Sequence, residues 1–303
     1  MDYCFFLNLK PKLSNFIHLL FESFYDCKEI RNAESSFANL CAYSFIYHGE
    51  YAIVKNCLVT RIHFDYGKRI SYHYPIGRGC QEEVLEALIE DAKLNNYEMS
   101  LLCHPSDISD RLKPRFEFAP QRDFFDYLYL RSDLQNLRGR KYQPKRNHIN
   151  KFKALYDWEF KILGSQDKVE CMKLEREWIA NSVLKNPDLE QDYRNEEKIV
   201  EYLFEHFDEL GIFAGAIKVD GIIVAFSLGS SINRDTFDVH IEKANRDFEG
   251  AFAIINQQMA EHLPQNFVYI NREEDLGIEG LRKAKQSYYP FQLIEKYIAT
   301  LCR

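Results

Sequence analysis

The stretch from Ile212 to Ala244 constrains the fold of this chain more than any other part of its sequence. It reads IFAGAIKVDGIIVAFSLGSSINRDTFDVHIEKA, in which apolar runs alternate with two short polar turns. Asp220-Gly221 between two apolar runs is a strong hairpin signal, because glycine readily adopts the positive φ that a tight turn needs. A second turn falls at Asn-Arg-Asp. The stretch therefore predicts three antiparallel strands near 212–219, 222–230 and 236–242.

Helical and extended patterns flank these three strands. Apolar residues recur on one helical face from Ile199 to Leu210, just before the strands. After them, GAFAIINQQMAEHL (250–263) predicts a helix, FVYI (267–270) a strand and FQLIEKYIA (291–299) a last strand. This order of elements matches the acyltransferase fold of the GNAT type.

The first half of the chain mixes similar elements. CAYSFIYHGEYAIVKNCLVTRIHF (41–64) predicts two or three β-runs, QEEVLEALIEDAKL (81–94) an amphipathic helix, and YEMSLLCH (97–104) and FFDYLYL (124–130) further strands. We expect an α/β (α+β) protein of two tandem GNAT-like domains, with mixed, mostly antiparallel sheets flanked by helices. The expected parts are an N-terminal domain at 1–135, a basic connector helix at 136–156 and a C-terminal domain at 157–303.

Composition narrows the class of protein. Of 303 residues, 46% are hydrophobic and the net charge is −7, which argues against a generally basic nucleic-acid coat protein. The eight cysteines form no C-x-x-C pair, a usage typical of a reduced, cytosolic protein. The opening MDYCFFLNLKPKLSNFIHLL lacks the pattern of a signal peptide, and no stretch approaches the ~20 apolar residues of a membrane span. We expect a cytoplasmic protein that could touch a membrane only peripherally.

A basic segment lies between the two halves. LQNLRGRKYQPKRNHINKFKALY (134–156) holds seven basic residues and no acid, whereas the rest of the chain carries 32 basic and 46 acidic residues. Such segregation attracts polyanions, and Tyr142 and His148 could stack on a base. A solvated connector helix would show the same charges. The side chains expected to bind an anion such as tRNA are Arg138, Arg140, Lys141, Lys145, Arg146, His148, Asn150 and Lys153.

Two acid–base patterns occur in the second half. His240 and Glu242 lie two apart on a predicted strand and so point to one side, where either could act as a general base. A polar, solvent-facing strand would look the same. In INREEDLGIEGLRKAKQSYYP (270–290), acids precede a predicted helix and bases follow, as the helix dipole favours. The dipole does not account for Asn271-Arg272 at a strand end, where ligand contacts are expected. Without His or Cys spacing, no metal site is expected.

One further segment resembles a cofactor loop. KANRDFEGAFAIIN (243–256) lies where an acetyl-coenzyme-A transferase carries R-x-x-G-x-G/A before a helix, but the spacing differs and Phe252 replaces a small residue. The segment therefore gives little support to coenzyme A binding. No cofactor is firmly implied.

Three longer motifs carry a family resemblance. GRKYQPKRNHINKF (139–152), VHIEKANRDFEGAFAIINQ (239–257) and the 270–290 stretch resemble stand-alone proteins related to the C-terminal domain of phosphatidylglycerol lysyltransferase, from about Phe37 to Tyr297. The resemblance implies two tandem GNAT-like domains, as in the Fem-type peptidyltransferases. It also implies transfer of an aminoacyl group from aminoacyl-tRNA to the glycerol hydroxyl of phosphatidylglycerol.

The resemblance and the residue patterns together predict an aminoacyl or acyl transferase. Aminoacyl-tRNA is the expected donor and a lipid head group or small molecule the acceptor. The alternatives are an N-acyltransferase that uses a coenzyme A thioester and a non-catalytic module of the same fold that binds nucleic acid or another anion. The expected catalytic residues are His240, Glu242, Asn271 and Arg272, and those expected to bind substrate are Glu273, Glu274, Asp275, Arg282 and Lys285.

Overall fold

The computed structural model describes residues 6–8, 30–64 and 68–302. The predictions made for the first 20 residues therefore fall almost wholly outside the described part. The chain forms two compact units. The first comprises residues 1–126, 274–282 and 293–303, and the second comprises 127–273 and 283–292. The predicted domains were consecutive stretches of the chain. In the structure, the first unit also includes residues 274–282 and 293–303 from near the C-terminus.

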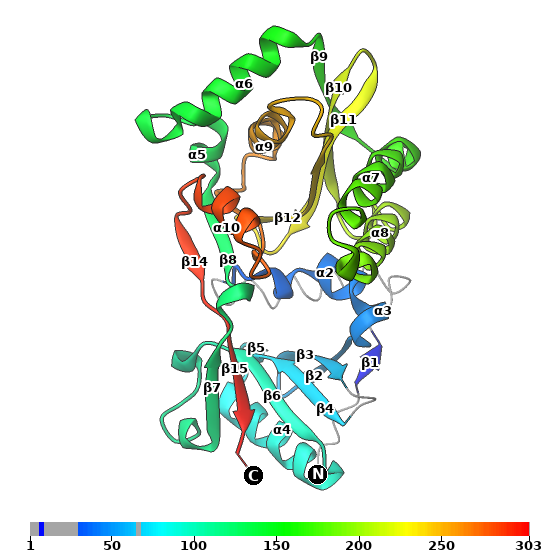
Figure 1. Ribbon diagram of the computed structural model, residues 1–303. Helices are drawn as coiled ribbons and strands as arrows, with labels where there is room; N and C mark the ends of the chain where they lie inside the picture. The colour runs from blue at the N-terminus through cyan, green and yellow to red at the C-terminus, as the bar shows by residue number, and fades with distance from the viewer. Residues whose placement is uncertain (1–5, 9–29, 65–67, 303) are drawn as a thin grey trace. The chain divides into compact units, whose positions relative to one another are not determined.

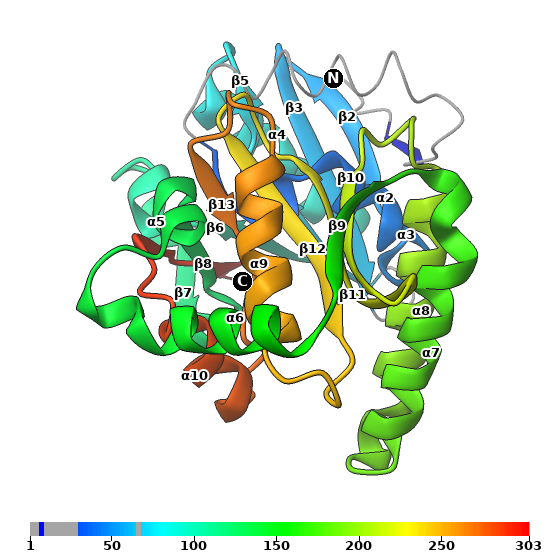
Figure 2. The same cartoon turned by 90° about the horizontal axis from the view of Figure 1, so that it is seen from above.

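The second unit is built on a seven-stranded sheet flanked by helices (Figures 1 and 2). In spatial order its strands are β14 (Gln292–Ile294), β8 (Asp126–Leu130), β13 (Tyr269–Asn271), β12 (Thr236–Ala244), β11 (Ile222–Ser231), β10 (Phe213–Val219) and β9 (Trp158–Leu163). Its helices are α5 (Arg131–Asn136), α6 (Gln143–Leu155), α7 (Lys168–Val183), α8 (Glu190–Glu205), α9 (Ala251–His262) and the second half of α10 (Glu279–Gln286). Helix α9 packs on one face of β10–β12, and α7 packs on the other (Figure 2).

The predicted β-meander is confirmed as β10–β11–β12, with antiparallel pairing throughout. Both turn residues of its first hairpin have positive φ, 51° at Asp220 and 79° at Gly221, as the tight turn requires. The predicted helix at 250–263 is confirmed as α9, and of the connector predicted to be helical at 136–156, residues 143–155 form α6. Together with α7 and α8, these elements follow the predicted GNAT-like order.

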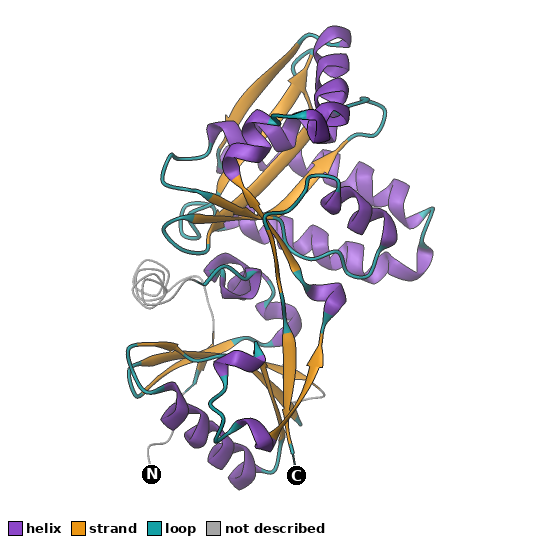
Figure 3. Ribbon diagram, turned by 90° about the vertical axis from the view of Figure 1, so that its left-hand side faces the viewer, coloured by secondary structure: helices purple, strands orange, loops and turns teal. Residues whose placement is uncertain are grey.

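The first unit contains an eight-stranded sheet (Figure 3). Seven strands lie in the order β1 (Leu7–Asn8), β2 (Glu50–Val54), β3 (Cys57–Phe64), β4 (Arg69–His73), β6 (Glu98–Cys103), β15 (Tyr297–Leu301) and β7 (Phe116–Pro120), while β5 (Ile76–Gly77) pairs with β3. Its helices are α2 (Phe37–Ala42), α3 (Ser44–Tyr47) and α4 (Gln81–Asn95). The face of α4 predicted to be apolar, from Val84 to Ala92, is buried in the core.

Short 3-10 turns join these elements in both units. They span Ala33–Ser35, Pro105–Asp107, Lys113–Arg115, Arg122–Phe124, Arg140–Tyr142, Ser165–Asp167 and Pro187–Leu189. No helix in the described part of the chain combines the length and the apolar character that a membrane crossing requires.

Two predicted strands are wrong in detail. Residues 41–47 were expected to be extended, but they form the end of α2 and the short helix α3. Ser36 caps α2 by accepting a hydrogen bond from the Asn39 amide. The expected last strand at 291–299 is two strands, β14 and β15, which belong to different sheets. Between them lies Lys296, whose buried ammonium forms an ion pair with Asp126 at 2.6 Å. The same ammonium also pairs with Glu34, and such a buried charge with fixed partners is a local constraint that alternation of apolar residues does not reveal.

Candidate functional site

The parallel strands β12 and β13 of the second unit pair over only three residues. The pairing runs from Thr236 with Tyr269 to Asp238 with Asn271, and β12 then continues alone on this side to Ala244. Beyond Asn271 the chain stays with β8, because the Arg272 amide donates to the Tyr127 carbonyl at 3.0 Å. The two chains therefore separate beyond Asp238 and Asn271, at the carboxyl ends of parallel strands where ligands commonly bind.

The first unit has its own parallel pair, β4 and β6, and it stays closed. Its pairing covers five residues, from Arg69 with Glu98 to His73 with Leu102. The Tyr74 amide then still donates to the Leu102 carbonyl at 3.2 Å. In the described part of the chain, the opening between parallel strands is thus a feature of the second unit.

Strand β12 also carries a β-bulge at the opening. Leu228 pairs with Ile241 and Gly229 pairs with Val239, so His240 is the extra residue. Bulges redirect side chains and often occur beside active sites. This bulge lies between Asp238 and Glu242, the two polar residues on either side of His240 along the strand.

Glu242 and Arg272 lie on the two separating chains and form an ion pair. Arg272 Nη2 donates to Glu242 Oε1 at 2.8 Å, and the Asn256 side-chain amide of α9 donates to Oε2 at 3.2 Å. The guanidinium lies 5.0 Å from the ring centre of Tyr288 and 5.7 Å from that of Tyr129. Burial alone would lower the pKa of Arg272, but Glu242 beside it raises that pKa above its usual range.

Three polar atoms around this pair are buried and have no hydrogen-bond partner among the described residues. They are Arg272 Nη1, Asn256 Oδ1 and the hydroxyl of Ser227, which faces Glu242 across the β11–β12 pair. Buried polar atoms are nearly always paired in native proteins, so such a group of exceptions requires an explanation. A polar ligand bound between the separating strands would supply the missing partners.

Lys145 reaches this cluster from helix α6. Its ammonium lies 3.9 Å from the ring centre of Tyr288, the same ring that Arg272 approaches. Burial and the nearby Arg272 lower the pKa of Lys145 to about 8, although Glu242 acts in the opposite direction. Lys145 was predicted to bind an anion, and in the structure it lies over the same Tyr288 ring as Arg272.

His240 lies in a second group within the same opening. Its Nε2 is 2.8 Å from the Ser230 hydroxyl, and its Nδ1 is 3.2 Å from Glu273 Oε1 and 3.4 Å from Asp238 Oδ2. The side chain is 1% exposed, so both ring nitrogens are engaged within the protein. Asp238, His240 and Glu273 offer three ligand atoms within 4.8 Å of one another, and these residue types could hold a divalent cation.

The remaining residues predicted near 271–285 fall into two groups. In the second unit, the buried Asn271 accepts from the Glu273 amide at 2.7 Å, and the buried ammonium of Lys285 donates to the Arg272 carbonyl. These contacts fix the turn that carries Arg272 and Glu273.

Glu274, Asp275 and Arg282 belong to the first unit. Asp275 is fully buried and accepts from Arg282 Nε at 2.9 Å and from Nη2 at 2.8 Å. Arg282 Nη2 also binds Asp123 at 2.7 Å. The charges of Asp275 and Arg282 are therefore paired within the first unit.

The basic segment places most of its predicted side chains in solvent. Arg138, Arg140, Lys141, His148, Asn150 and Lys153 are exposed. Arg146 instead folds back and donates to the carbonyls of Leu137 and Gly139. Tyr142 is 1% exposed and donates to the Tyr288 carbonyl at 3.1 Å, so the prediction that it stacks on a base is wrong.

Helix α6 lies against the start of α9. Gly250, which precedes α9, has a φ of 94°, and a Cβ there would lie 2.5 Å from the His148 carbonyl oxygen. Arg246 lies 5.8 Å from the ring of Trp178 on α7. The 243–256 segment thus packs against α6 at its glycine, and its arginine approaches a different helix.

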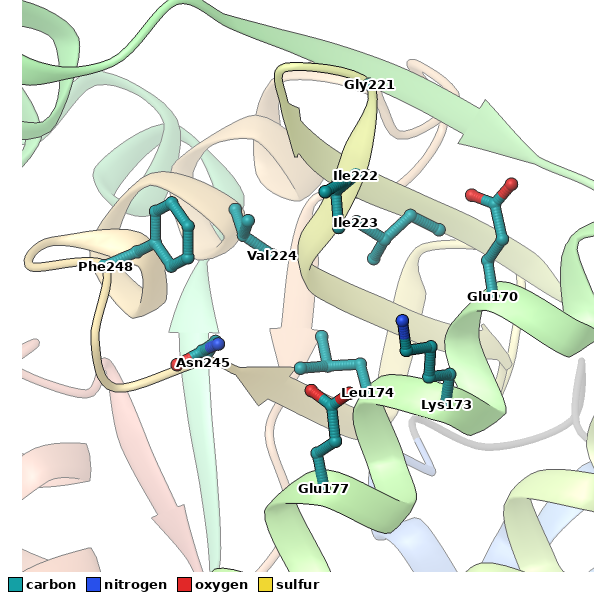
Figure 4. A pocket seen from close by; sticks show the side chains of 10 residues that line it. All are labelled: Glu170, Lys173, Leu174, Glu177, Gly221, Ile222, Ile223, Val224, Asn245 and Phe248. Carbon is teal, nitrogen blue, oxygen red and sulfur yellow. The ribbon is translucent and has the colours of Figure 1, made fainter.

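A separate pocket of about 260 Å³ lies beside α7 (Figure 4). Lys173 and Leu174 of α7 extend toward Ile223 of β11, and Asn245 and Phe248 complete one side. It includes none of the predicted site residues. The pocket lies beside α7, whereas the Glu242 carboxylate contacts Asn256 of α9.

Sequence reasoning missed Tyr288, Tyr129, Asn256 and Ser227. Tyr288 lies within the quoted 270–290 motif, and Asn256 is a buried amide in an otherwise apolar helix face. Either could have been noted. Tyr129 and Ser227 reach the site through strand pairing and carry no sequence signal of their own.

Comparison with known proteins identifies relatives over nearly the whole chain. The profile of the family "Phosphatidylglycerol lysyltransferase, C-terminal" matches residues 28–300. A conserved protein of unknown function from Bacteroides thetaiotaomicron is 39% identical, with a TM-score of 0.91 over 99% of this chain and 100% of that one. L-PGS from Bacillus licheniformis is 16% identical, with a TM-score of 0.62 over 96% and 92% of the two chains.

A curated relative matches a shorter part of the chain. The uncharacterized protein MYCGA3080 of Mycoplasmoides gallisepticum is 24% identical over 181 residues, which are 57% of this chain. The match spans 55% of the length of that relative.

Proposed function

Because the chain belongs to the family of the phosphatidylglycerol lysyltransferase C-terminal domain, we propose that it transfers an aminoacyl group from aminoacyl-tRNA to a lipid head group or small-molecule acceptor. The family and fold are those of GNAT-like acyltransferases. The observation that carries the finer proposal is the partly buried Glu242–Arg272 pair in the opening between β12 and β13, surrounded by buried polar atoms that have no partner among the described residues.

An aminoacyl ester is already activated, so its transfer needs mainly alignment and stabilisation of charge. Aligning the two reactants can supply ~7–11 kcal/mol of the barrier. Arg272 offers a donor, Nη1, that no described residue uses, and Glu242 fixes the guanidinium through Nη2. We assign Nη1 to the oxyanion that forms at the ester carbonyl, where a preorganised donor is most effective.

Several of the other predicted site residues take positioning roles in this proposal. Asn271 and Lys285 bind the backbone of the turn that carries Arg272. His240 holds Glu273, the next residue, through Nδ1. A fixed turn keeps Arg272 in one orientation, which an oxyanion contact requires.

The exposed basic side chains of α6 and the preceding loop suit the tRNA. A tRNA acceptor end is a polyanion, and contacts to its phosphates require exposed cations. Arg138, Arg140, Lys141 and Lys153 meet that requirement. Lys145, on the same helix, links this surface to the Glu242–Arg272 pair.

The packing of α6 against the start of α9 favours aminoacyl-tRNA over a coenzyme A thioester as donor. Transferases that use coenzyme A hold its pyrophosphate on free amides at a helix N-terminus. Here Gly250 contacts the His148 carbonyl so closely that a Cβ would not fit.

The test uses tRNA charged with radiolabelled amino acids, mixed with the protein and a lipid or metabolite extract. We expect label to leave the tRNA faster than background and to appear on an extract component. The absence of deacylation above background, together with the absence of salt-sensitive tRNA binding, would overturn the proposal. Thermal stabilisation by coenzyme A would favour the thioester alternative, and tRNA binding without deacylation would favour a binding module.

A further inference from the structure

Lys145 differs from the other cations of its segment in its surroundings. It is partly buried, and its ammonium lies over the ring of Tyr288, 3.9 Å from the ring centre. Among the described residues, no carboxylate lies close enough to form an ion pair with it, whereas Lys151 on the same helix binds Glu249. A lysine that faces a reaction site without an ion-pair partner can exchange its proton with a substrate.

The other candidate bases are engaged within the protein. Glu242 accepts hydrogen bonds from Arg272 at 2.8 Å and from Asn256 at 3.2 Å. His240 has Ser230 at one ring nitrogen and Glu273 at the other, at 2.8 Å and 3.2 Å. A base must reach the proton that it removes, so both residues would first have to break these contacts.

We infer that Lys145 is the residue that takes the proton from the acceptor in the proposed aminoacyl transfer, an inference that rests on that proposed function. The acceptor is a hydroxyl compound in this account. Lys145 touches the reacting atoms and is therefore a catalytic residue, whereas the exposed cations of α6 bind the tRNA.

The proton balance of the step is closed. As the acceptor oxygen forms a bond to the ester carbonyl carbon, its proton moves to the neutral amine of Lys145, and the carbonyl oxygen becomes an oxyanion beside Arg272. When the carbon–oxygen bond to the tRNA ribose breaks, the Lys145 ammonium gives the proton to the leaving ribose oxygen. Lys145 ends neutral, and no other reactant is consumed.

The charges around Lys145 fit this role. The groups that act on its charge are Arg272 from the β13 end, Glu242 from β12, and the Tyr288 ring against which it packs. Burial and Arg272 together bring the pKa of Lys145 to about 8, so a useful fraction is neutral near physiological pH. A lysine in ordinary solvent, with a pKa of ≈ 10.4, would be almost fully protonated there.

A first experiment separates proton transfer from anion binding. Lys145→Arg keeps the positive charge but removes the titration, because guanidinium stays protonated. The assay measures single-turnover transfer from tRNA charged with labelled amino acids to vesicles of phosphatidylglycerol and phosphatidylcholine, from pH 6.5 to 9. We expect the wild-type rate to rise through pH 8, and Lys145→Arg to be slower by roughly 10²–10⁴-fold with unchanged tRNA binding.

The matched control is Lys218→Arg, a substitution of a partly buried lysine of the second unit that binds Glu170 at 2.9 Å. It should leave rate and pH profile unchanged. A Lys145→Arg variant with near wild-type rate and profile would overturn the inference while leaving the proposed function intact. A wild-type protein that releases no label at all would instead overturn the proposed function.

A second measurement needs no activity. The protein is treated with an amine-acylating reagent at a series of pH values, and modification of Lys145 is read by peptide mass spectrometry. We expect half-maximal reactivity of Lys145 near pH 8, with Glu242→Gln moving it lower because Glu242 favours the charged form. A midpoint for Lys145 at the ordinary value of lysines would contradict the inference.

Discussion

Arg272 uses one terminal nitrogen to bind Glu242, and the other, though buried, has no hydrogen-bond partner among the residues that the structure describes. This difference between the two nitrogens is the main evidence that Arg272 has a functional role. A purely structural buried ion pair normally satisfies its remaining donors, because unpaired buried polar atoms cost free energy. The asymmetry indicates that the pair is arranged to meet something other than the protein.

The first prediction concerns Glu242→Gln, which keeps the size of the side chain and removes its charge. Arg272 would lose the carboxylate that orients it, and the oxyanion contact with it. We expect single-turnover release of label from aminoacyl-tRNA to fall by roughly 10²-fold or more, while far-ultraviolet circular dichroism stays unchanged. A rate close to that of the wild type would show that the Glu242–Arg272 pair is structural.

The second prediction concerns Glu175, which is fully buried on α7, with both carboxylate oxygens lacking hydrogen-bond partners among the described residues. Burial raises its pKa from 4.5 to about 8, against the nearby Lys243, whose ammonium is 3.7 Å away. The folded protein then holds a proton that the unfolded chain releases above pH 4.5. The free energy of unfolding should therefore fall as pH rises from about 5 to 8.

Glu175→Gln removes this titration. Urea unfolding at pH 5 and pH 8 should show the variant gaining stability relative to the wild type at the higher pH, by up to about 1 kcal/mol per pH unit. A stability difference that does not change with pH would contradict the raised pKa of Glu175.

At the scale of elements, helix α6 carries both Lys145, which reaches the candidate site, and exposed cations proposed to bind the tRNA. Its buried face, with Ile149 and Phe152, packs into the second unit, Lys145 reaches the site, and the exposed cations face solvent. The close contact between Gly250 and the His148 carbonyl sets how near α6 lies to the start of α9. The position of Lys145 therefore depends on a glycine more than 100 residues away in the sequence.

Gly250→Ala tests that dependence. Gly250 and Gly139 both have positive φ, 94° and 91°, so alanine strains the backbone at either by roughly 1–2 kcal/mol. Only at Gly250 would the new methyl group also meet the His148 carbonyl, at 2.5 Å. We expect Gly250→Ala to lower the thermal midpoint more than Gly139→Ala and to slow transfer. Equal effects would show that the α6–α9 contact is not critical.

The exposed face of α6 and its preceding loop gives a further prediction. Changing Arg140, Lys141 and Lys153 together to Glu should weaken tRNA binding and flatten its salt dependence, because each phosphate contact adds ~0.7–0.9 to the slope of log K against log salt. The control reverses Lys55, Lys93 and Arg111 of the first unit, which are also exposed. Equal loss of binding in both variants would indicate attraction by overall charge and not by α6.

At the scale of the molecule, local patterns predicted most elements but not how the strands are distributed. The Asp220-Gly221 turn and the apolar faces of α4 and α9 act over a few residues, so the sequence alone was enough to find them. The placement of β8 in the second sheet and of β15 in the first depends on pairing between distant segments. No local signal reports such pairing, and the single strand expected at 291–299 was wrong for this reason.

Like the fold, the candidate site was predicted only in part from the sequence. His240, Glu242, Arg272 and Glu273 were identified because polar residues at strand ends stand out against apolar runs. Asp275 and Arg282 carry the same charges but bind each other in the first unit, and the contact of Lys145 with the Tyr288 ring had no signal in the sequence. Charge type can be read from a sequence, whereas the partner of each charge depends on the fold.

The two units also differ in the feature that defines the site. Each has a parallel strand pair and a partly buried Arg–Glu ion pair, Arg61–Glu50 at 2.7 Å in the first and Arg272–Glu242 at 2.8 Å in the second. The parallel pair β4–β6 stays closed, whereas β12–β13 opens after three residues. We therefore propose that aminoacyl transfer takes place in the second unit and not in the first.

The most direct test compares Arg272→Lys with Arg61→Lys for the rate at which label leaves aminoacyl-tRNA in a single turnover. Lysine keeps the charge but not the paired donors of the guanidinium. We predict that Arg272→Lys slows release by roughly 10²–10³-fold and that Arg61→Lys leaves it within about twofold of the wild type. Equal rates for the two variants, or a larger loss for Arg61→Lys, would contradict the account.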